Sequence, residues 1–367
     1  MNVEKLHKLA YDIVEDDNEY DISGKFTSMM SQLNLMVTQP QPQHQNNFTT
    51  HLNSLYESLG ESEMNSLSPA WVQVLIELGI DDLFGDKLKL KLQQILNTNT
   101  ITPSNANVEF KTYRERHNAC IGSFTNLVDS LETLQIGRDE LSEGQCEIGI
   151  LIPRQFIDNN LNKFEKEIGE INFILEHFSE LITGDKKPFE LRSLSTSEPL
   201  VTVATYVGIA AGISTVIATL ISGYKGILEI RNIKNQAKEK GVSDANVKGL
   251  EKHCESVIKK EITKLRKELD KKYTVISDEG RKNEIMNSIE MCLKKLVNRI
   301  DNGFSFEVRM EEPEVEYDED EEPIKSEDFL LYNEIQEASA KMEFLNTEGN
   351  PILFLNEDNP DTKTDVK

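Results

Sequence analysis

The chain has 367 residues and a formal net charge of −24, with 28% charged and 38% hydrophobic residues, enough for two or three domains and a sizeable core. Its four cysteines form no CxxC pair, which argues against a disulfide framework and a zinc site, and the N-terminus lacks a secretory apolar run. We therefore expect a cytoplasmic protein. The acidic balance argues against nucleic acid as a partner, because duplex binding usually needs a basic face.

Residues 1–136 are predicted to form an N-terminal helical region. Apolar residues recur at helical spacing in VEKLHKLAYDIV and in FTSMMSQLNLMV. Pro69 and Pro103 stand where prolines commonly begin helices. The polar, proline-interrupted run QPQPQHQNN predicts a linker at 39–47.

Residues 144–310 are predicted to form a second unit, built from strands and long helices. CEIGILIPR and PFELRSLS read as strands on either side of an amphipathic helix at 156–183, so a right-handed parallel crossover is the default expectation. Three helices should follow at about 199–240, 244–275 and 279–302, and FSFEVRM should add a closing strand at 304–310. The fold class expected is mainly α with a small β component (α+β).

The C-terminal part is strongly acidic. From Glu311 onward there are 19 acids and 4 bases, and nine of the acids fall within 311–322, which predicts an acidic linker at 311–328. A helix, a short strand in NTEGNPILFLNE and a disordered end are expected within 329–367. Residues 225–299 have the opposite balance, with 19 bases and 12 acids. The acidic segment therefore either screens these basic helices from anionic partners or serves only as a solubility linker.

Residues 200–224, LVTVATYVGIAAGISTVIATLISGY, carry no charge. As a single helix they would extend roughly 37 Å, enough to cross a bilayer core. Four Thr, two Ser and three Gly weaken the case for insertion. The bases that follow would stay on the cytosolic side, which requires export of the preceding chain without a signal. A core helix packed on its neighbours is the favoured interpretation, and association with a membrane stays open as the alternative.

Small residues form a seam along this predicted helix, with spacings of 4, 3, 4, 3 and 4: Gly208, Gly212, Thr215, Thr219, Ser222 and Gly226. Such a seam lets two helix backbones approach closely. Apolar stripes run along the next two helices, at Val247, Leu250, Cys254, Ile258, Ile262, Leu265 and Leu269, and at Ile285, Ile289, Leu293, Leu296 and Ile300. These stripes fit either a coiled coil or an antiparallel hairpin within one chain.

No catalytic, cofactor-binding or metal-binding constellation stands out. His117-x-x-Cys120 and His253-Cys254 lack the second pair of ligands that a metal site needs. The acidic pairs Asp16-Asp17 and Asp81-Asp82 are expected at helix ends or in loops, where solvation or capping accounts for them. RSLSTSEP has the hydroxyls of a helix N-terminus without a phosphate-binding glycine pattern, so capping by Ser197 is preferred. An enzyme with dispersed active-site residues stays possible, but the sequence nominates no residue for it.

Two functional hypotheses follow. The first is a non-enzymatic bacterial interaction protein that forms homo-oligomers, or binds another protein, through the helices 199–302. The second is a membrane-active bacterial effector, of toxin or defence type, whose apolar helix 200–224 enters or spans a bilayer.

Overall fold

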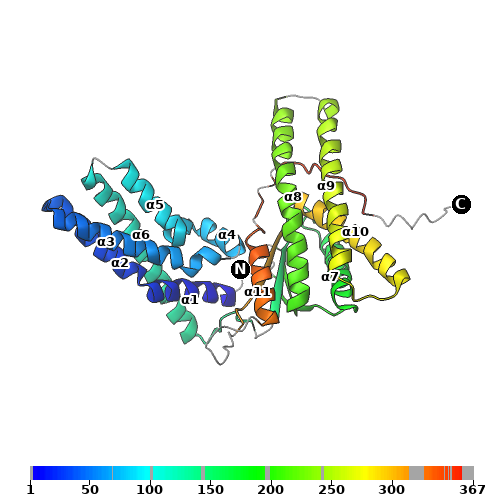
Figure 1. Ribbon diagram of the computed structural model, residues 1–367, viewed down its shortest axis with the longest axis horizontal. Coiled ribbons are helices and arrows are strands. Elements are labelled where there is room, and N and C mark those ends of the chain that lie inside the picture. Colours follow the sequence, from blue (N-terminus) through cyan, green and yellow to red (C-terminus); the bar gives the residue numbers. More distant parts are fainter. Residues whose placement is uncertain are drawn as a thin grey trace. The chain divides into compact units, whose positions relative to one another are not determined.

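The computed structural model describes residues 3–67, 69–99, 102–141, 145–194, 199–240, 244–313, 326–342, 344–345, 347 and 349–357. The chain forms two compact units, Met1–Glu140 and Leu141–Lys367 (Figure 1). Helices dominate both units, and one four-stranded sheet lies in the second. This architecture confirms the predicted fold class, mainly α with a small β component.

Unit 1 is a helical assembly made of α1 (Val3–Tyr20), α2 (Ile22–Thr38), α3 (Pro42–Glu61), α4 (Pro69–Leu78), α5 (Gly85–Thr98) and α6 (Pro103–Thr133). The linker predicted at 39–47 is wrong over most of its length, because α3 already begins at Pro42. Proline suits the first turn of a helix, where its missing N–H needs no partner. The polar run is therefore the first turns of a helix whose buried face begins at Phe48.

The sheet of unit 2 contains four strands in the order β2-β3-β1-β4: β1 (Gln145–Leu151), β2 (Glu190–Leu194), β3 (Leu200–Tyr206) and β4 (Ser305–Met310). Every neighbouring pair is antiparallel. Strands β1 and β2 run in the same direction, but β3 lies between them. The predicted parallel pairing across a simple crossover is therefore wrong, and the motif is a split βαβ unit.

Strand β3 occupies the start of the uncharged segment, which was predicted to be one helix. Its residues pair in register with β1, with Val203 opposite Ile148 and Val201 opposite Ile150. Val201 and Val203 are buried, as expected for alternate β-branched residues of a strand. The helix begins only at Val207. The predicted helices at 199–240 and 200–224 are therefore wrong at their start, because the run LVTVATY forms a strand.

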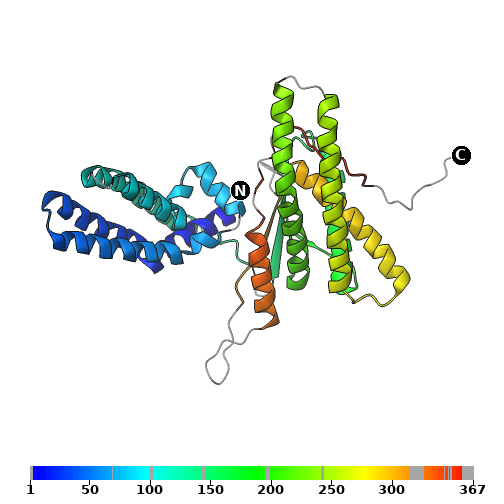
Figure 2. The same ribbon diagram turned by 45° about the horizontal axis from the view of Figure 1, so that its top comes forward.

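The helices of unit 2 are α7 (Leu161–Thr183), α8 (Val207–Glu239), α9 (Asp244–Lys272), α10 (Glu279–Asp301) and α11 (Glu327–Ser339). Side chains of α7, α8 and α10 meet Ile148, Ile150 and Phe306 on one face of the sheet. Helices α8 and α9 form an antiparallel hairpin, and the end at which they are joined extends beyond the other elements of the unit (Figures 1 and 2). Of the two interpretations of the apolar stripes, the structure shows the hairpin within one chain.

The C-terminal part differs from the prediction in two places. Helix α11 already begins at Glu327, inside the predicted linker. The described residues 349–357 lie against the core but belong to no strand, so the predicted short strand is wrong. Side chains, rather than a neighbouring strand, bind the main chain there. Most of the acidic linker (314–325) and the predicted disordered end (358–367) lie outside the described residues.

Candidate functional site

The first half of the seam is packed within its own unit. An added Cβ at Gly212 would lie 2.6 Å from Cδ1 of Ile182 and 2.7 Å from the hydroxyl of Tyr273, so a larger residue there would have to displace these side chains. The Thr215 hydroxyl donates to Oε1 of Glu334 on α11 over 3.0 Å. We call Gly208, Gly212, Thr215 and Thr219 the proximal seam. A Cβ at Gly208 would meet no described atom within 4 Å, so the close approach is confined to Gly212.

The second half of the seam is open. Ser222 and Gly226 are exposed, and a Cβ at Gly226 would meet no described atom within 4 Å. The stripe continues with spacings of 4, 3 and 4 into Ile230, Ile233 and Ala237, and Ile233 is 60% exposed. We call Ser222, Gly226, Ile230, Ile233 and Ala237 the distal face. It combines the small residues of the seam with apolar side chains, on the part of α8 that reaches towards the tip of the hairpin.

A lysine-rich face runs along α9. It borders an open groove of about 630 Å³ lined by Lys252, Glu255, Ser256, Lys259, Lys260, Thr263, Lys264 and Lys267. Two of its lysines pair with acids on the same helix, Lys259 with Glu255 at 3.0 Å and Lys264 with Glu268 at 4.0 Å. The other three form no ion pair among the described residues. In a chain with a net charge of −24, this face is a local site of attraction for anions.

A buried polar hub joins α8 to the end of α10. Arg231 is 1% exposed and Asp301 is fully buried, with 3.1 Å between Nη1 and Oδ1. The Tyr224 hydroxyl donates to the same Oδ1 over 2.5 Å, and desolvation is the main cause that raises the pKa of Tyr224. Arg231 is one of the bases that follow the uncharged segment 200–224 in the sequence. A charged residue on an otherwise apolar face was the signal that could have revealed this hub.

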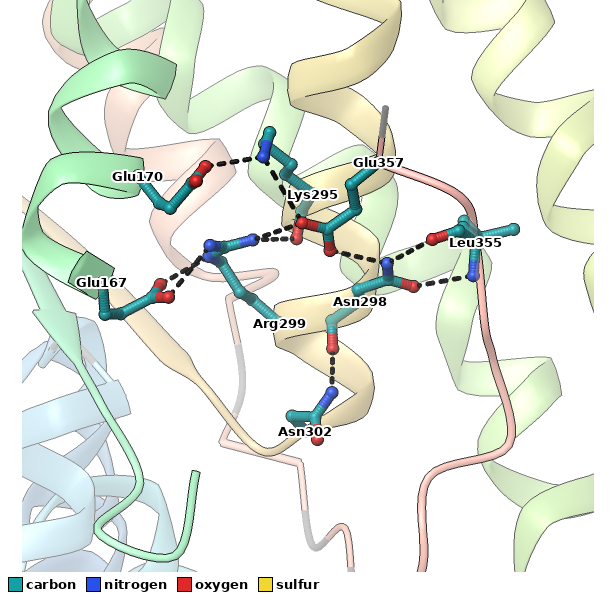
Figure 3. Close-up of polar contacts among 8 residues, drawn as sticks. All are labelled: Glu167, Glu170, Lys295, Asn298, Arg299, Asn302, Leu355 and Glu357. Carbon is teal, nitrogen blue, oxygen red and sulfur yellow. Dashed lines mark hydrogen bonds and ion pairs between the residues drawn. The ribbon is translucent and has the colours of Figure 1, made fainter. Parts of the chain in front are cut away.

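A second polar cluster surrounds Lys295 and Arg299 of α10 (Figure 3). Arg299 Nε lies 2.6 Å and its Nη2 3.0 Å from the two carboxylate oxygens of Glu167 on α7, a bidentate ion pair in which both residues are almost fully buried. Burial raises the pKa of Glu167, while the nearby Arg299 guanidinium acts in the opposite direction. Lys295 Nζ lies 2.6 Å from Glu170 Oε2. These contacts fix the position of α10 against α7.

Unit 1 has its own buried polar contacts. Nε2 of His117 lies 2.9 Å from Asp17 Oδ1, and its Nδ1 lies 3.1 Å from the carbonyl oxygen of Leu83. The Ser23 hydroxyl donates to Asp17 Oδ1 over 3.0 Å. The carboxylate therefore stands between the hydroxyl and the imidazole, whereas a nucleophilic triad needs the imidazole in the middle. This arrangement ties helices together and does not activate Ser23.

The acidic pairs predicted at helix ends or in loops have partners within the fold. Asp16 and Asp17 are buried, which corrects the solvation account. Asp16 accepts hydrogen bonds from the Ser62 hydroxyl at 2.8 Å and the Glu63 amide at 2.7 Å. Desolvation is the main cause that raises the pKa of Asp16. Asp82 binds Arg116 in a bidentate pair with both distances at 3.0 Å.

The cysteines are not activated for nucleophilic chemistry. Burial raises the pKa of Cys120 to about 11 and the pKa of Cys146 and Cys292 to about 12, and it also raises that of Cys254. A reactive cysteine needs the opposite shift. His253 is exposed while Cys254 is fully buried. Within the described residues no group of three His, Cys, Asp or Glu side chains could hold a metal ion. Ser197 lies outside the described residues.

Among the described helices, α8 alone is long and apolar enough to cross a membrane, over Val207–Ala237, and most of its apolar stretch is buried inside the unit. Buried core helices of soluble proteins satisfy the same criterion. No known protein family, curated protein or solved structure matches the chain.

Proposed function

We propose that the protein is a non-enzymatic interaction protein that self-associates through the distal face of α8. The observation that carries the proposal is the contrast along one helix stripe. Helix α11 lies beside α8 in both views and bonds to the proximal seam through Glu334 (Figures 1 and 2). The distal face has the same periodicity, with Ser222 and Gly226 exposed and Ile233 60% exposed. Ile230 is partly buried against the core of the unit.

Packing physics supports a helix as the partner. Small residues at a helix surface allow close backbone approach, and the neighbouring isoleucines supply apolar area for burial. A second copy offers an identical face, so two copies can meet through a two-fold, self-complementary contact. The apolar contact would then extend the core of each unit along α8.

The lysine face of α9 supplies the electrostatic part of the proposal. Residues 311–322 of each chain carry nine acids, which is complementary charge for these lysines in the same copy or in a neighbouring one. Exposed ion pairs contribute only about 0–1 kcal/mol each and weaken with salt. In this account the acidic segment screens the lysine face from other anionic partners and tunes association without driving it.

Static light scattering of the full chain at micromolar concentration tests the proposal. We expect the wild type to exceed the monomer mass and Ile233→Lys to return it to the monomer. Val108→Lys is a matched control, because Val108 is 66% exposed on a helix of unit 1. A wild type that stays monomeric, or an Ile233→Lys variant that associates as the wild type does, would reject the proposal.

The membrane-active effector remains the second candidate, favoured by the length and apolar character of α8. Insertion would require α8 to lose the close packing at Gly212 and the ion pair between Arg231 and Asp301. Co-sedimentation with anionic liposomes before and after acidification or mild heating tests this function. Binding that appears only after such a trigger and is reduced by Lys260→Glu would support it. A chain that stays in the supernatant under all these conditions would exclude it.

A further inference from the structure

The described C-terminal segment, residues 349–357, lies along α10 as an extended chain whose main chain is bound by side chains. Asp301 Oδ2 accepts from the amides of Ile352 at 2.9 Å and Leu353 at 2.6 Å. Just before this segment and at its start, Arg231 Nη2 donates to the carbonyl oxygens of Thr347 and Gly349, both at 2.6 Å. Arg231 and Asp301 also bind each other, with 3.1 Å between Nη1 and Oδ1.

Asn298 forms the next contact along the segment. Its Oδ1 accepts from the Leu355 amide at 3.3 Å, and its Nδ2 donates to the Leu355 carbonyl at 2.9 Å (Figure 3). One side-chain amide thus satisfies both main-chain groups of a residue, as a neighbouring strand would. Contacts of this kind recognise an extended main chain whatever its side chains.

Side chains of the segment supply the selectivity. Ile352, Leu353 and Leu355 are buried, with at most 5% exposed, whereas Phe354 is 69% exposed. The Glu357 carboxylate follows, 2.7 Å from Asn298 Nδ2 and 3.4 Å from Lys295 Nζ. The groove therefore selects apolar residues at the positions of Ile352, Leu353 and Leu355, and an acid at the position of Glu357.

The segment does not fill this groove. A cavity of about 330 Å³ lies beside it, lined from the body of the unit by Phe156, Asn298, Arg299 and Asn302 and from the segment by Pro351 and residues 353–357. This cavity is open to solvent on one side, so a side chain entering it would come from the surface. A ligand with a larger side chain in this region would bury more surface than the native segment does.

We propose that the groove formed by Arg231, Lys295, Asn298, Arg299 and Asp301 is a binding site for extended peptides of the pattern apolar-apolar-x-apolar-x-acid. The chain's own residues 352–357 are its tethered occupant. A peptide of this pattern on a partner protein displaces them. Four of the five groove residues are on α10, and none belongs to the distal face. The peptide-binding proposal is therefore tested independently of self-association.

Covalent attachment of residues 352–357 to the chain determines how strongly they compete with an added peptide. A segment attached to the same chain has an effective concentration in the millimolar range, so an intrinsic Kd of about 10 µM would appear roughly 100-fold weaker in the wild type. The probe is a fluorescent synthetic peptide with the sequence of residues 347–357. The receptor is the full-length chain carrying Leu353→Asp and Leu355→Asp, which weaken the tethered occupant.

We expect saturable binding to this variant, at least 10-fold tighter than to the wild type, and loss of binding when Asn298→Ala is added. A peptide carrying the same two aspartates is the matched control and should not bind.

Folding of the receptor variant is followed by circular dichroism. If the variant is unfolded, recovery of its helical signal on adding the native peptide, but not the control peptide, supports the site. A folded variant that binds both peptides alike, or an unfolded one that the native peptide does not restore, would overturn the proposal.

Discussion

The two halves of the α8 stripe share one spacing and have different environments. At Gly212 the helix is packed so closely that a single added carbon would overlap Ile182 and Tyr273, whereas at Gly226 the same carbon would meet no described atom. The difference shows that a seam of small residues does not identify its partner. The proximal seam is packed inside the chain at Gly212, whereas Ser222 and Gly226 of the distal face are exposed.

The largest loss of stability should come from breaking the buried ion pair between Arg231 on α8 and Asp301 on α10. Asp301→Ala leaves Arg231 buried without its carboxylate partner and removes the acceptor of two main-chain amides. Breaking a buried ion pair in this way typically costs about 3–5 kcal/mol. Chemical denaturation followed by circular dichroism should therefore show a large loss of stability. A loss below about 1 kcal/mol would mean that the hub does not hold α8 in place.

Gly212→Leu tests the proximal seam. The added side chain has no space between α7 and Tyr273, and overpacking of this kind costs about 1–3 kcal/mol, occasionally more. Gly226→Leu is the matched control and should leave the monomer's unfolding free energy within about 0.5 kcal/mol or raise it. Equal losses from both variants would show that the two halves do not differ as described.

Gly226→Ala should stabilise the isolated chain slightly. Glycine inside a helix is about 0.5–1 kcal/mol less favourable than alanine, and the added methyl group meets no described atom. Thermal unfolding at a concentration too low for association should thus show a small rise in Tm. A fall in Tm would indicate that another part of the chain occupies this position.

The smallest effect concerns the lysine face. Truncation after Met310 removes both the acidic segment and α11, so the cleaner change is to replace four acids within 311–322 by glutamine or asparagine. We expect stronger retention on a phosphate-bearing resin at low salt and no difference at high salt, because exposed charges are screened within about 10 Å at 0.1 M. Retention equal to the wild type at low salt would leave the segment a linker only.

Much of the architecture can be predicted from the sequence, because the spacing of apolar residues along a helix indicates which of its faces is buried. The stripe at Ile285, Ile289 and Leu293 is buried as its spacing predicts. Strand β3 was missed because an uncharged run rich in Val and Thr satisfies helix and strand patterns alike, and pairing with Ile148 and Ile150 decides between them. The order of residues within a short segment does not show which distant strand it will pair with.

The candidate sites were less predictable. The seam residues were identified from spacing alone, but the sequence did not show that α11 would contact Thr215 and leave Gly226 open. The peptide groove depends on residues from α8, α10 and the C-terminal segment that are far apart in the sequence, such as Arg231 and Gly349, which are 118 positions apart. Nothing in the separate stretches links an arginine in an apolar helix to a distant main-chain carbonyl.

Site-directed cross-linking tests most directly whether the distal face meets a second copy. Ser222→Cys places a thiol on the distal face, and Ser256→Cys places a control thiol at another exposed position, on the lysine face. With a short bismaleimide at micromolar protein concentration, the account predicts a covalent dimer for Ser222→Cys that Ile233→Lys abolishes, and little dimer for Ser256→Cys. Monomer alone from Ser222→Cys, or equal dimer from the two cysteine variants, would contradict it.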